Sequence, residues 1–341
     1  FVIESNAKLA PNSNATMNDL TVEFLADDRD GLSTSDISVD GTTARVPASA
    51  ISGDAARVHA APYDGEVHGM ADTAMLDPSG EVHLPNRPPE WMKNGVMYEI
   101  FTRSFAGERG ETDMQYLTDK VSYLDELGID AVWLTPIYPS VSSSKEMAGG
   151  GPHGYDATDY MSVAPDLGTV EEYQTFIETC NEHDIKVVFD MVINHSGRGH
   201  PYFQDTISSK GDAPPAESWE FPPVEGWNQD SKYFDWFDRM EAPIYGPDGG
   251  VVDPEPANTG FWGLRLQPNW NFDNMALREH MLAVADFWSG EVGVDGFRCD
   301  IAWGTPHSFW KEVRDLVRSN NSEFLMLDES VPYFADFSEG E

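Results

Sequence analysis

The sequence predicts an α/β fold, because apolar strands alternate with amphipathic helices from residue 96 to residue 327. Three of these strands end on acids: Val187–His195 contains Asp190, and the segments 296–300 and 324–329 close on Asp300 and Glu329. Parallel strands place their carboxyl ends on one rim of a sheet, so these acids are expected to share a site. The pattern favours a (β/α)8 TIM barrel, incomplete in this chain with about five strands.

A doubly wound dinucleotide-binding sheet is the alternative reading of repeated βα units. Such a sheet needs a glycine-rich turn after its first strand. Here the first strand, Val96–Phe101, leads into Thr102-Arg103-Ser104-Phe105, which contains no glycine. The barrel is therefore preferred, and no organic cofactor is expected.

The first 88 residues lack helical periodicity and predict an N-terminal β-sandwich domain. Short alternating segments separated by turn residues are the basis: 21–25, 37–41, 44–46, 56–60 and 81–84. The segment Pro85–Pro89 is rich in proline and reads as a stiff linker.

The barrel is predicted in two parts, residues 89–193 and 274–341, separated by an inserted small domain at 194–273. Strands are expected at 96–101, 131–134, 186–192, 293–299 and 324–327, and the second part stops after the fifth of them. Helices with one apolar face are expected between them, with the apolar positions falling within 114–127, 169–184, 277–288 and 309–317. The insertion is unusually aromatic, with Trp219, Phe221, Trp227, Tyr233, Phe234, Trp236, Phe237, Tyr245, Phe261 and Trp262. Most of these rings are expected to form a local core.

The chain is strongly and evenly acidic, with 59 Asp and Glu against 21 Lys and Arg, a net charge of −38. This charge argues against nucleic acid and membrane surfaces as partners. An acidic surface with few lysines favours a cytoplasmic protein of a high-salt cell, where screening removes the self-repulsion. An ordinary acidic protein with a functional anionic face is the alternative. Secretion is also left open, because the sequence begins with Phe1.

Two carboxyls at neighbouring strand ends can cleave a glycosidic bond with retention when they lie about 5 Å apart. Asp300 is the predicted nucleophile, and Glu329 is the predicted acid/base. Arg298 lies two residues before Asp300, so both side chains point to the same side of the strand. A guanidinium there would keep the nucleophile ionised and oriented. The alternative interpretation is that Arg298 and Asp300 form only a structural ion pair at the strand end.

Five segments resemble the α-amylase family of glycoside hydrolases, in the family's order: His153–Tyr160, Asp190–His195, Gln267–Asn271, Gly296–Asp300 and Leu327–Glu329. The resemblance covers residues 95 to 330. It implies that Tyr155 stacks under the sugar, that His195 hydrogen-bonds the sugar ring, and that Asp190 holds the polar network together. It also implies a calcium ion bound through Asn194, as in many members, since an amide oxygen suits Ca²⁺, while related glucosidases lack the ion.

Three departures from the family pattern are visible. Trp303 stands where a lysine is common and would contact the sugar beyond the cleaved bond by stacking, while Asp328 stands where glycine is common. The family's third catalytic carboxylate would follow Glu341. We therefore expect the chain to be a truncated piece of a longer protein and to be inactive alone.

The resemblance implies a substrate as well. Asp156, next to Tyr155, resembles a residue of members that grip a terminal glucose. An α-1,4-glucan such as starch, or a malto-oligosaccharide, is therefore the expected substrate. A transglycosylase or trehalose-forming isomerase on the same scaffold is the first alternative, and a non-catalytic carbohydrate-binding relative is the second.

Overall fold

The computed structural model describes residues 21–26, 31–40, 43–52, 56–63, 72–80, 82–83, 88–106, 112–143, 153–207, 226–245, 248–253, 255–261 and 267–329. The chain divides into two compact units, Phe1–Arg87 and Pro88–Glu341. The division falls at the proline-rich segment that the sequence marks as a linker.

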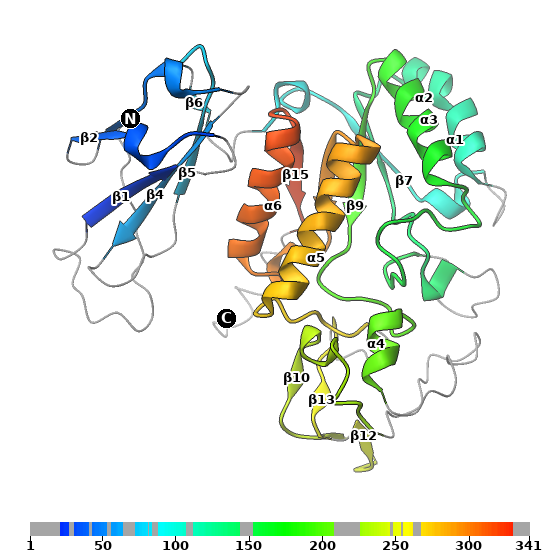
Figure 1. Cartoon of the computed structure of the whole chain (residues 1–341). Coiled ribbons are helices and arrows are strands. Elements are labelled where there is room, and N and C mark those ends of the chain that lie inside the picture. The colour runs from blue at the N-terminus through cyan, green and yellow to red at the C-terminus, as the bar shows by residue number, and fades with distance from the viewer. Residues whose placement is uncertain are drawn as a thin grey trace, which may run out of the picture. The chain divides into compact units, whose positions relative to one another are not determined.

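The first unit is built from antiparallel strands around a small apolar core (Figure 1). A four-stranded sheet has the order β1-β4-β5-β6, and a separate hairpin pairs β2 with β3. The strands are β1 (Thr21–Ala26), β2 (Ser38–Asp40), β3 (Thr43–Arg45), β4 (Ala56–Tyr63), β5 (Asp72–Leu76) and β6 (Val82–His83). Strand β5 was not predicted, because its sequence lacks a clear alternation of apolar and polar residues. Short 3-10 turns lie at Thr34–Asp36 and Ala48–Ala50.

The second unit contains a five-stranded parallel sheet in the order β7-β8-β9-β14-β15 (Figure 1). Its strands are β7 (Met97–Ile100), β8 (Ala131–Leu134), β9 (Lys186–Met191), β14 (Gly296–Cys299) and β15 (Leu325–Asp328). All five predicted strands are present within a few residues. Their spatial order follows the sequence without reversal, as in a barrel, whereas a doubly wound sheet reverses at its centre. The described residues form this open part of the barrel and do not close it.

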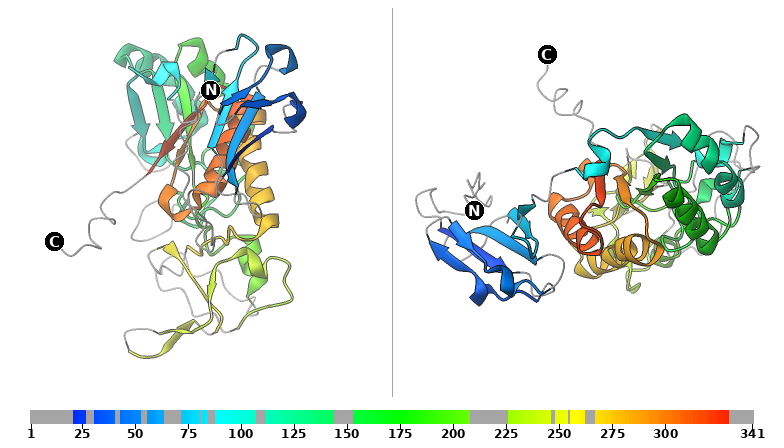
Figure 2. Two further views of the ribbon diagram at one scale, coloured as in Figure 1. Left: turned by 90° about the vertical axis from the view of Figure 1, so that its left-hand side faces the viewer. Right: turned by 90° about the horizontal axis from the view of Figure 1, so that it is seen from above.

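Helices cover the outer side of the curved sheet (Figure 2). They are α1 (Met114–Asp119), α2 (Val121–Leu127), α3 (Val170–Glu182), α5 (Met275–Asp286), which continues as a π-helical turn over Phe287–Val292, and α6 (His307–Asn320). Helix α4 (Pro201–Thr206) lies apart from them. The single helix predicted after the first strand is broken at Lys120 into α1 and α2. Helix α3 starts with a capping box between Thr169 and Glu172, which satisfies two otherwise unpaired backbone amides.

Large aromatic side chains fill the space between the sheet and these helices. Phe189 of β9 stacks on Trp288 with ring centroids 4.2 Å apart, and Tyr138 meets Phe189 edge-on at 5.1 Å. All three are fully buried. Buried rings of this size supply much of the hydrophobic stabilisation and hold the strand ends rigidly.

The segment between β9 and α5 lies beyond the carboxyl ends of the strands (Figure 1). It contains α4, the strand pair β10 (Arg239–Met240) and β13 (Ala257–Asn258), and the pair β11 (Ile244–Tyr245) and β12 (Val251–Asp253). Its end returns to the barrel, where Trp270 N donates to Asn194 O at 3.1 Å. Of the predicted aromatic set, Trp219, Phe221 and Trp262 lie outside the described residues. The remaining 3-10 turns lie at Glu90–Met92, Thr102–Ser104, Val141–Ser143, Phe234–Trp236 and Ala302–Gly304.

In the described part of the chain, no helix combines the length and the apolar character needed to cross a bilayer.

Candidate active site

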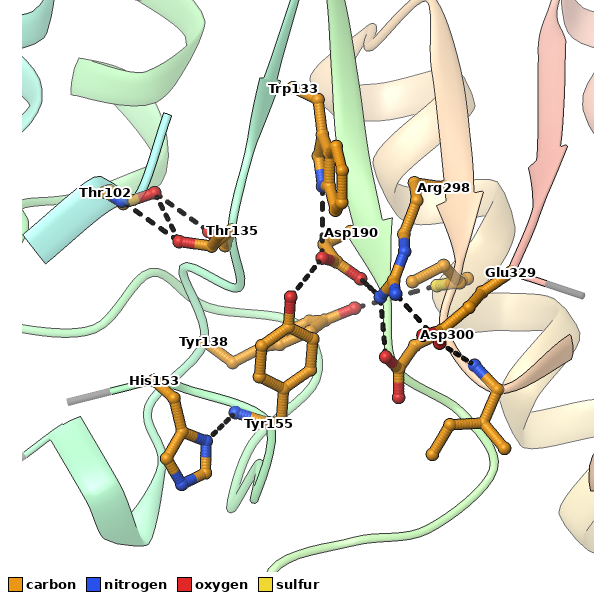
Figure 3. Close-up of polar contacts among 12 residues, drawn as sticks. Thr102, Trp133, Thr135, Tyr138, His153, Tyr155, Asp190, Arg298, Asp300 and Glu329 are labelled. Carbon is orange, nitrogen blue, oxygen red and sulfur yellow. Dashed lines mark hydrogen bonds and ion pairs between the residues drawn. The ribbon is translucent and has the colours of Figure 1, made fainter. Parts of the chain in front are cut away.

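Strand register brings the predicted site residues together at one rim of the sheet (Figure 3). Arg298 of β14 lies directly opposite Asp190 of β9, so the two side chains share one face. Past the strand ends the ladder continues, with Asp300 N donating to Met191 O and Glu329 N donating to Cys299 O, both at 3.1 Å. These backbone bonds fix where each carboxyl leaves the sheet.

Arg298 binds three carboxyls with its guanidinium (Figure 3). Its Nη1 lies 2.9 Å from Asp190 Oδ1 and 2.5 Å from Asp300 Oδ1, and its Nη2 lies 2.8 Å from Glu329 Oε2. One guanidinium therefore spans the gap between Asp300 and Glu329. Such charge-assisted bonds are stronger and more directional than neutral ones.

The two predicted catalytic carboxyls, Asp300 and Glu329, differ in burial and in hydrogen bonding. Asp300 is buried, its Oδ1 faces Arg298, and its Oδ2 has no hydrogen-bond partner in the described part of the chain. Glu329 is half-buried, with 37% of its side chain exposed, and its Oε2 also accepts from Ile301 N at 2.8 Å. An unpartnered oxygen buried at a strand end is unusual in a purely structural ion pair.

Three acids around one base leave excess negative charge, which raises carboxyl pKa values. Burial, followed by the charges of Asp190 and Glu329, raises the pKa of Asp300 to about 8, against the lowering effect of Arg298. Burial also raises the pKa of Asp190 to about 6. Burial alone would lower the pKa of Arg298, but Asp190 and Asp300 outweigh it and raise that pKa. The raised pKa of Asp300 means that this carboxyl holds a proton near neutral pH.

Two aromatic side chains complete the surroundings of Asp190. Tyr155 donates its hydroxyl to Asp190 Oδ2 at 3.0 Å, and Trp133 of β8 donates Nε1 to the same oxygen at 3.1 Å. Both rings lie near the Arg298 guanidinium, with centroids at 5.7 Å for Tyr155 and 5.0 Å for Trp133. The sequence reading missed Trp133, although its place near the end of a predicted strand was a usable signal.

His195 is buried, and one of its ring nitrogens bonds to the protein backbone. Its Nε2 lies 2.7 Å from Tyr155 O, and since a carbonyl only accepts, this nitrogen carries the hydrogen. Burial lowers the pKa of His195 to about 4, so the ring is neutral at neutral pH. Phe261 stacks on the ring at 5.5 Å, and Gln267 donates to the same Tyr155 carbonyl at 3.2 Å. Neither Phe261 nor Gln267 was singled out as a site residue from the sequence.

Two other predicted site residues lie apart from this cluster in their contacts. Asp156 is buried, and its Oδ1 accepts from Ser142 Oγ at 2.5 Å and from Ser142 N at 3.1 Å. Its carboxylate thus holds the turn at 141–143 in place. Trp303 follows Asp300 in the turn Ala302–Gly304 and is 48% exposed, so its ring is accessible.

The described residues around Asn194 leave the calcium prediction untested. The Asn194 Oδ1 lies 3.3 Å from His195 Nδ1, and its Nδ2 packs so closely on Gly304 that a Cβ there would come within 2.5 Å. No group of three or more His, Cys, Asp or Glu side chains suited to a metal occurs in the described part of the chain. Calcium binding stays a prediction, and no step below depends on it.

A parallel barrel sheet with paired carboxyls at its rim is the arrangement of the barrel glycoside hydrolases as a class. The family model described as the alpha-amylase catalytic domain matches residues 99–332. The chain belongs to the α-amylase family.

Named relatives extend this result. The chain is 35% identical to alpha-amylase MalA of Haloarcula japonica over 99% of this chain and 46% of the relative. It is 31% identical to the trehalose synthase/amylase TreS of Mycobacterium tuberculosis over 74% of this chain and 43% of the relative. The chain spans less than half the length of both. A solved cyclic α-maltosyl-(1→6)-maltose hydrolase from Arthrobacter globiformis is 26% identical with a TM-score of 0.55, over 71% of this chain and 52% of that one.

Proposed function

We propose that the protein carrying this chain is a retaining glycoside hydrolase that cleaves α-1,4-glucosidic bonds of malto-oligosaccharides or starch-type glucans. The observation that carries the proposal is the Arg298 guanidinium held between the Asp300 and Glu329 carboxyls. A pair of carboxyls that share one guanidinium suits a double displacement, in which one attacks and the other transfers a proton.

In the first step, Asp300 Oδ2 attacks the anomeric carbon, because this oxygen has no partner in the described part of the chain. The bond from the anomeric carbon to the leaving oxygen breaks as Glu329 gives its proton to that oxygen. In the second step, the Glu329 carboxylate takes a proton from water, and the water oxygen displaces Asp300 from the anomeric carbon. The enzyme is thereby restored, and the configuration is retained.

The excess negative charge of the cluster favours the binding of one proton by its carboxyls. Asp190, Asp300 and Glu329 carry three negative charges against one positive charge when all are ionised. In the substrate-free site, burial favours the proton on Asp300, whereas attack requires Asp300 ionised and Glu329 protonated. Since Asp300 and Glu329 both bond to the Arg298 guanidinium, the proton can move from one to the other when a sugar replaces water.

The test is hydrolysis of maltotriose and soluble starch by the full-length protein, with the product anomer observed by NMR before mutarotation. The α-anomer is expected first. The substitutions Asp300→Asn and Glu329→Gln should each reduce kcat by at least about 10³-fold. Asp328→Asn, which removes the exposed neighbouring carboxylate, is the matched control. A β-anomer as first product, or activity that survives both substitutions, would refute the proposal.

Similarity to a trehalose synthase/amylase supports a second candidate, an isomerase or transglycosylase on the same scaffold. Both reactions share the covalent intermediate and differ in whether water or a sugar attacks it. Incubation with maltose separates them, because glucose indicates hydrolysis and trehalose or longer oligosaccharides indicate transfer. A non-catalytic carbohydrate-binding role is disfavoured because Asp300 and Glu329 are both present and share Arg298.

A cytoplasmic location in a high-salt cell is also proposed. The even acidic composition supports it, and so does the 35% identity to a relative from Haloarcula japonica.

A further inference from the structure

Ile301, the residue after the proposed nucleophile, has a left-handed backbone with φ 46° and ψ 47°. A β-branched residue rarely adopts this conformation, because its Cβ crowds the backbone, and doing so costs free energy. Such strain persists only where the surroundings fix it, and it gathers at functional sites.

The surroundings of Ile301 do fix this conformation. Its side chain is 5% exposed, and Gly304 N donates to Ile301 O at 2.8 Å. Gly304 has no room for a side chain, since a Cβ there would lie 3.1 Å from Ile301 Cγ2 and 2.5 Å from Asn194 Nδ2. The turn at 302–304 and the segment after β9 therefore hold the strained residue from two sides.

The left-handed turn ends the extended run of β14 and points one amide at the proposed acid/base. Ile301 N donates to Glu329 Oε2 at 2.8 Å, and Arg298 Nη2 lies 2.8 Å from the same oxygen. Both groups can only donate hydrogen bonds. A hydroxyl hydrogen on Oε2 would therefore face two donors, whereas Oε1 meets no such pair of donors among the described residues.

We propose that Ile301 is a positioning residue whose strained amide, with Arg298, holds Glu329 Oε2 as an acceptor, so that Oε1 carries the proton given to the leaving group. The inference rests on the proposed function and adds the atom that transfers the proton. Glu329 remains the catalytic residue, and Ile301 acts through it.

The test replaces Ile301 by its α-hydroxy acid analogue, which turns the amide into an ester and removes the N–H while keeping the side chain. Two substrates are compared in the full-length protein: maltotriose, whose leaving group needs a proton, and 2,4-dinitrophenyl α-maltoside, whose leaving group does not. We expect kcat on maltotriose to fall about tenfold or more, and kcat on the dinitrophenyl substrate to change much less. The same ester exchange at Thr305, whose amide bonds Ala302 O at 3.4 Å, is the matched control.

Equal losses on both substrates, or no loss on either, would overturn the inference while leaving the proposed function standing. An unaltered protein that cleaves neither substrate would overturn the proposed function and this inference with it. A second measurement does not depend on the ester folding: an atomic-resolution crystal structure of Glu329→Gln. The amide oxygen should face Ile301 N with the amide nitrogen turned away, and the reverse orientation would contradict the inference.

Discussion

Replacing Asp300 by asparagine should stabilise the protein increasingly as the pH rises. Burial and its acidic neighbours raise the pKa of Asp300 from 3.8 to about 8, so the folded state binds a proton that the unfolded state releases. This group's favourable contribution is complete below pH 3.8 and is lost as the pH rises towards 8. Asparagine does not ionise, so Asp300→Asn keeps its unfolding free energy where the unaltered protein loses stability with rising pH.

The gain in unfolding free energy follows from the difference between the two pKa values of Asp300, 3.8 and about 8. A tenfold change in an equilibrium constant corresponds to about 1.4 kcal/mol, so the gain can be at most about 6 kcal/mol above pH 8 and about 4 kcal/mol at pH 7. Asp190 shares the same guanidinium and its pKa is raised as well, so the measured gain should be about half of this maximum. A gain of about 2 kcal/mol at pH 7 is expected.

The assay is urea unfolding followed by tryptophan fluorescence between pH 4 and pH 9, at constant high salt. The difference in unfolding free energy between Asp300→Asn and the unaltered protein should grow with pH up to about 8 and then level off. Asp328→Asn, which removes an exposed carboxylate from the same rim, is the control for the loss of one negative charge. A difference that stays constant with pH, or that decreases as the pH rises, would refute this reading of the site.

Three further outcomes are expected. Arg298→Met leaves Asp190, Asp300 and Glu329 without their shared base and should cost about 3–5 kcal/mol of unfolding free energy. Arg298→Lys should recover part of this loss. Equal stability of the unaltered protein and both variants in urea would contradict the account. Gly304→Ala forces a Cβ to within 2.5 Å of Asn194 Nδ2 and should cost about 1–3 kcal/mol of unfolding free energy in the same assay. Gly250→Ala, where the nearest atom to the new Cβ is 3.3 Å away, should cost less. The opposite ranking would count against the tight packing beside Ile301. The net charge of −38 predicts that the thermal midpoint rises by several degrees between about 0.1 M and 2 M KCl in scanning fluorimetry, and an unchanged or lower midpoint would argue against adaptation to salt.

The strand pattern and the acids at strand ends could be predicted from the sequence because both depend on local order. A strand of alternating faces fixes which side Arg298 shares with Asp300, and parallel pairing then brings Asp190 beside them. The side chains that surround this centre depend on contacts between distant segments. Trp133 reaches Asp190 across 57 residues, and no local pattern encodes that distance.

Other features carry no sequence signal at all. The left-handed backbone of Ile301 occurs at a β-branched residue, where glycine or asparagine would have been the usual indication. The family resemblance places Asp156 at the sugar, which stays a prediction, and no local pattern indicates that Ser142 bonds its carboxylate. Adjacent residues in a loop can face different ways, and only the tertiary contacts decide which one enters the site.

The most direct test of the central claim is to trap the covalent intermediate on the full-length protein with a 5-fluoro-α-glucosyl fluoride, which forms the glycosyl-enzyme faster than it is hydrolysed. Peptide mass spectrometry after digestion should place one added fluoroglucosyl group on the Asp300 carboxyl, and Asp300→Asn should carry none. A label on Asp190 or Glu329, or turnover of the reagent with no covalent adduct, would contradict the assignment of Asp300 as the nucleophile.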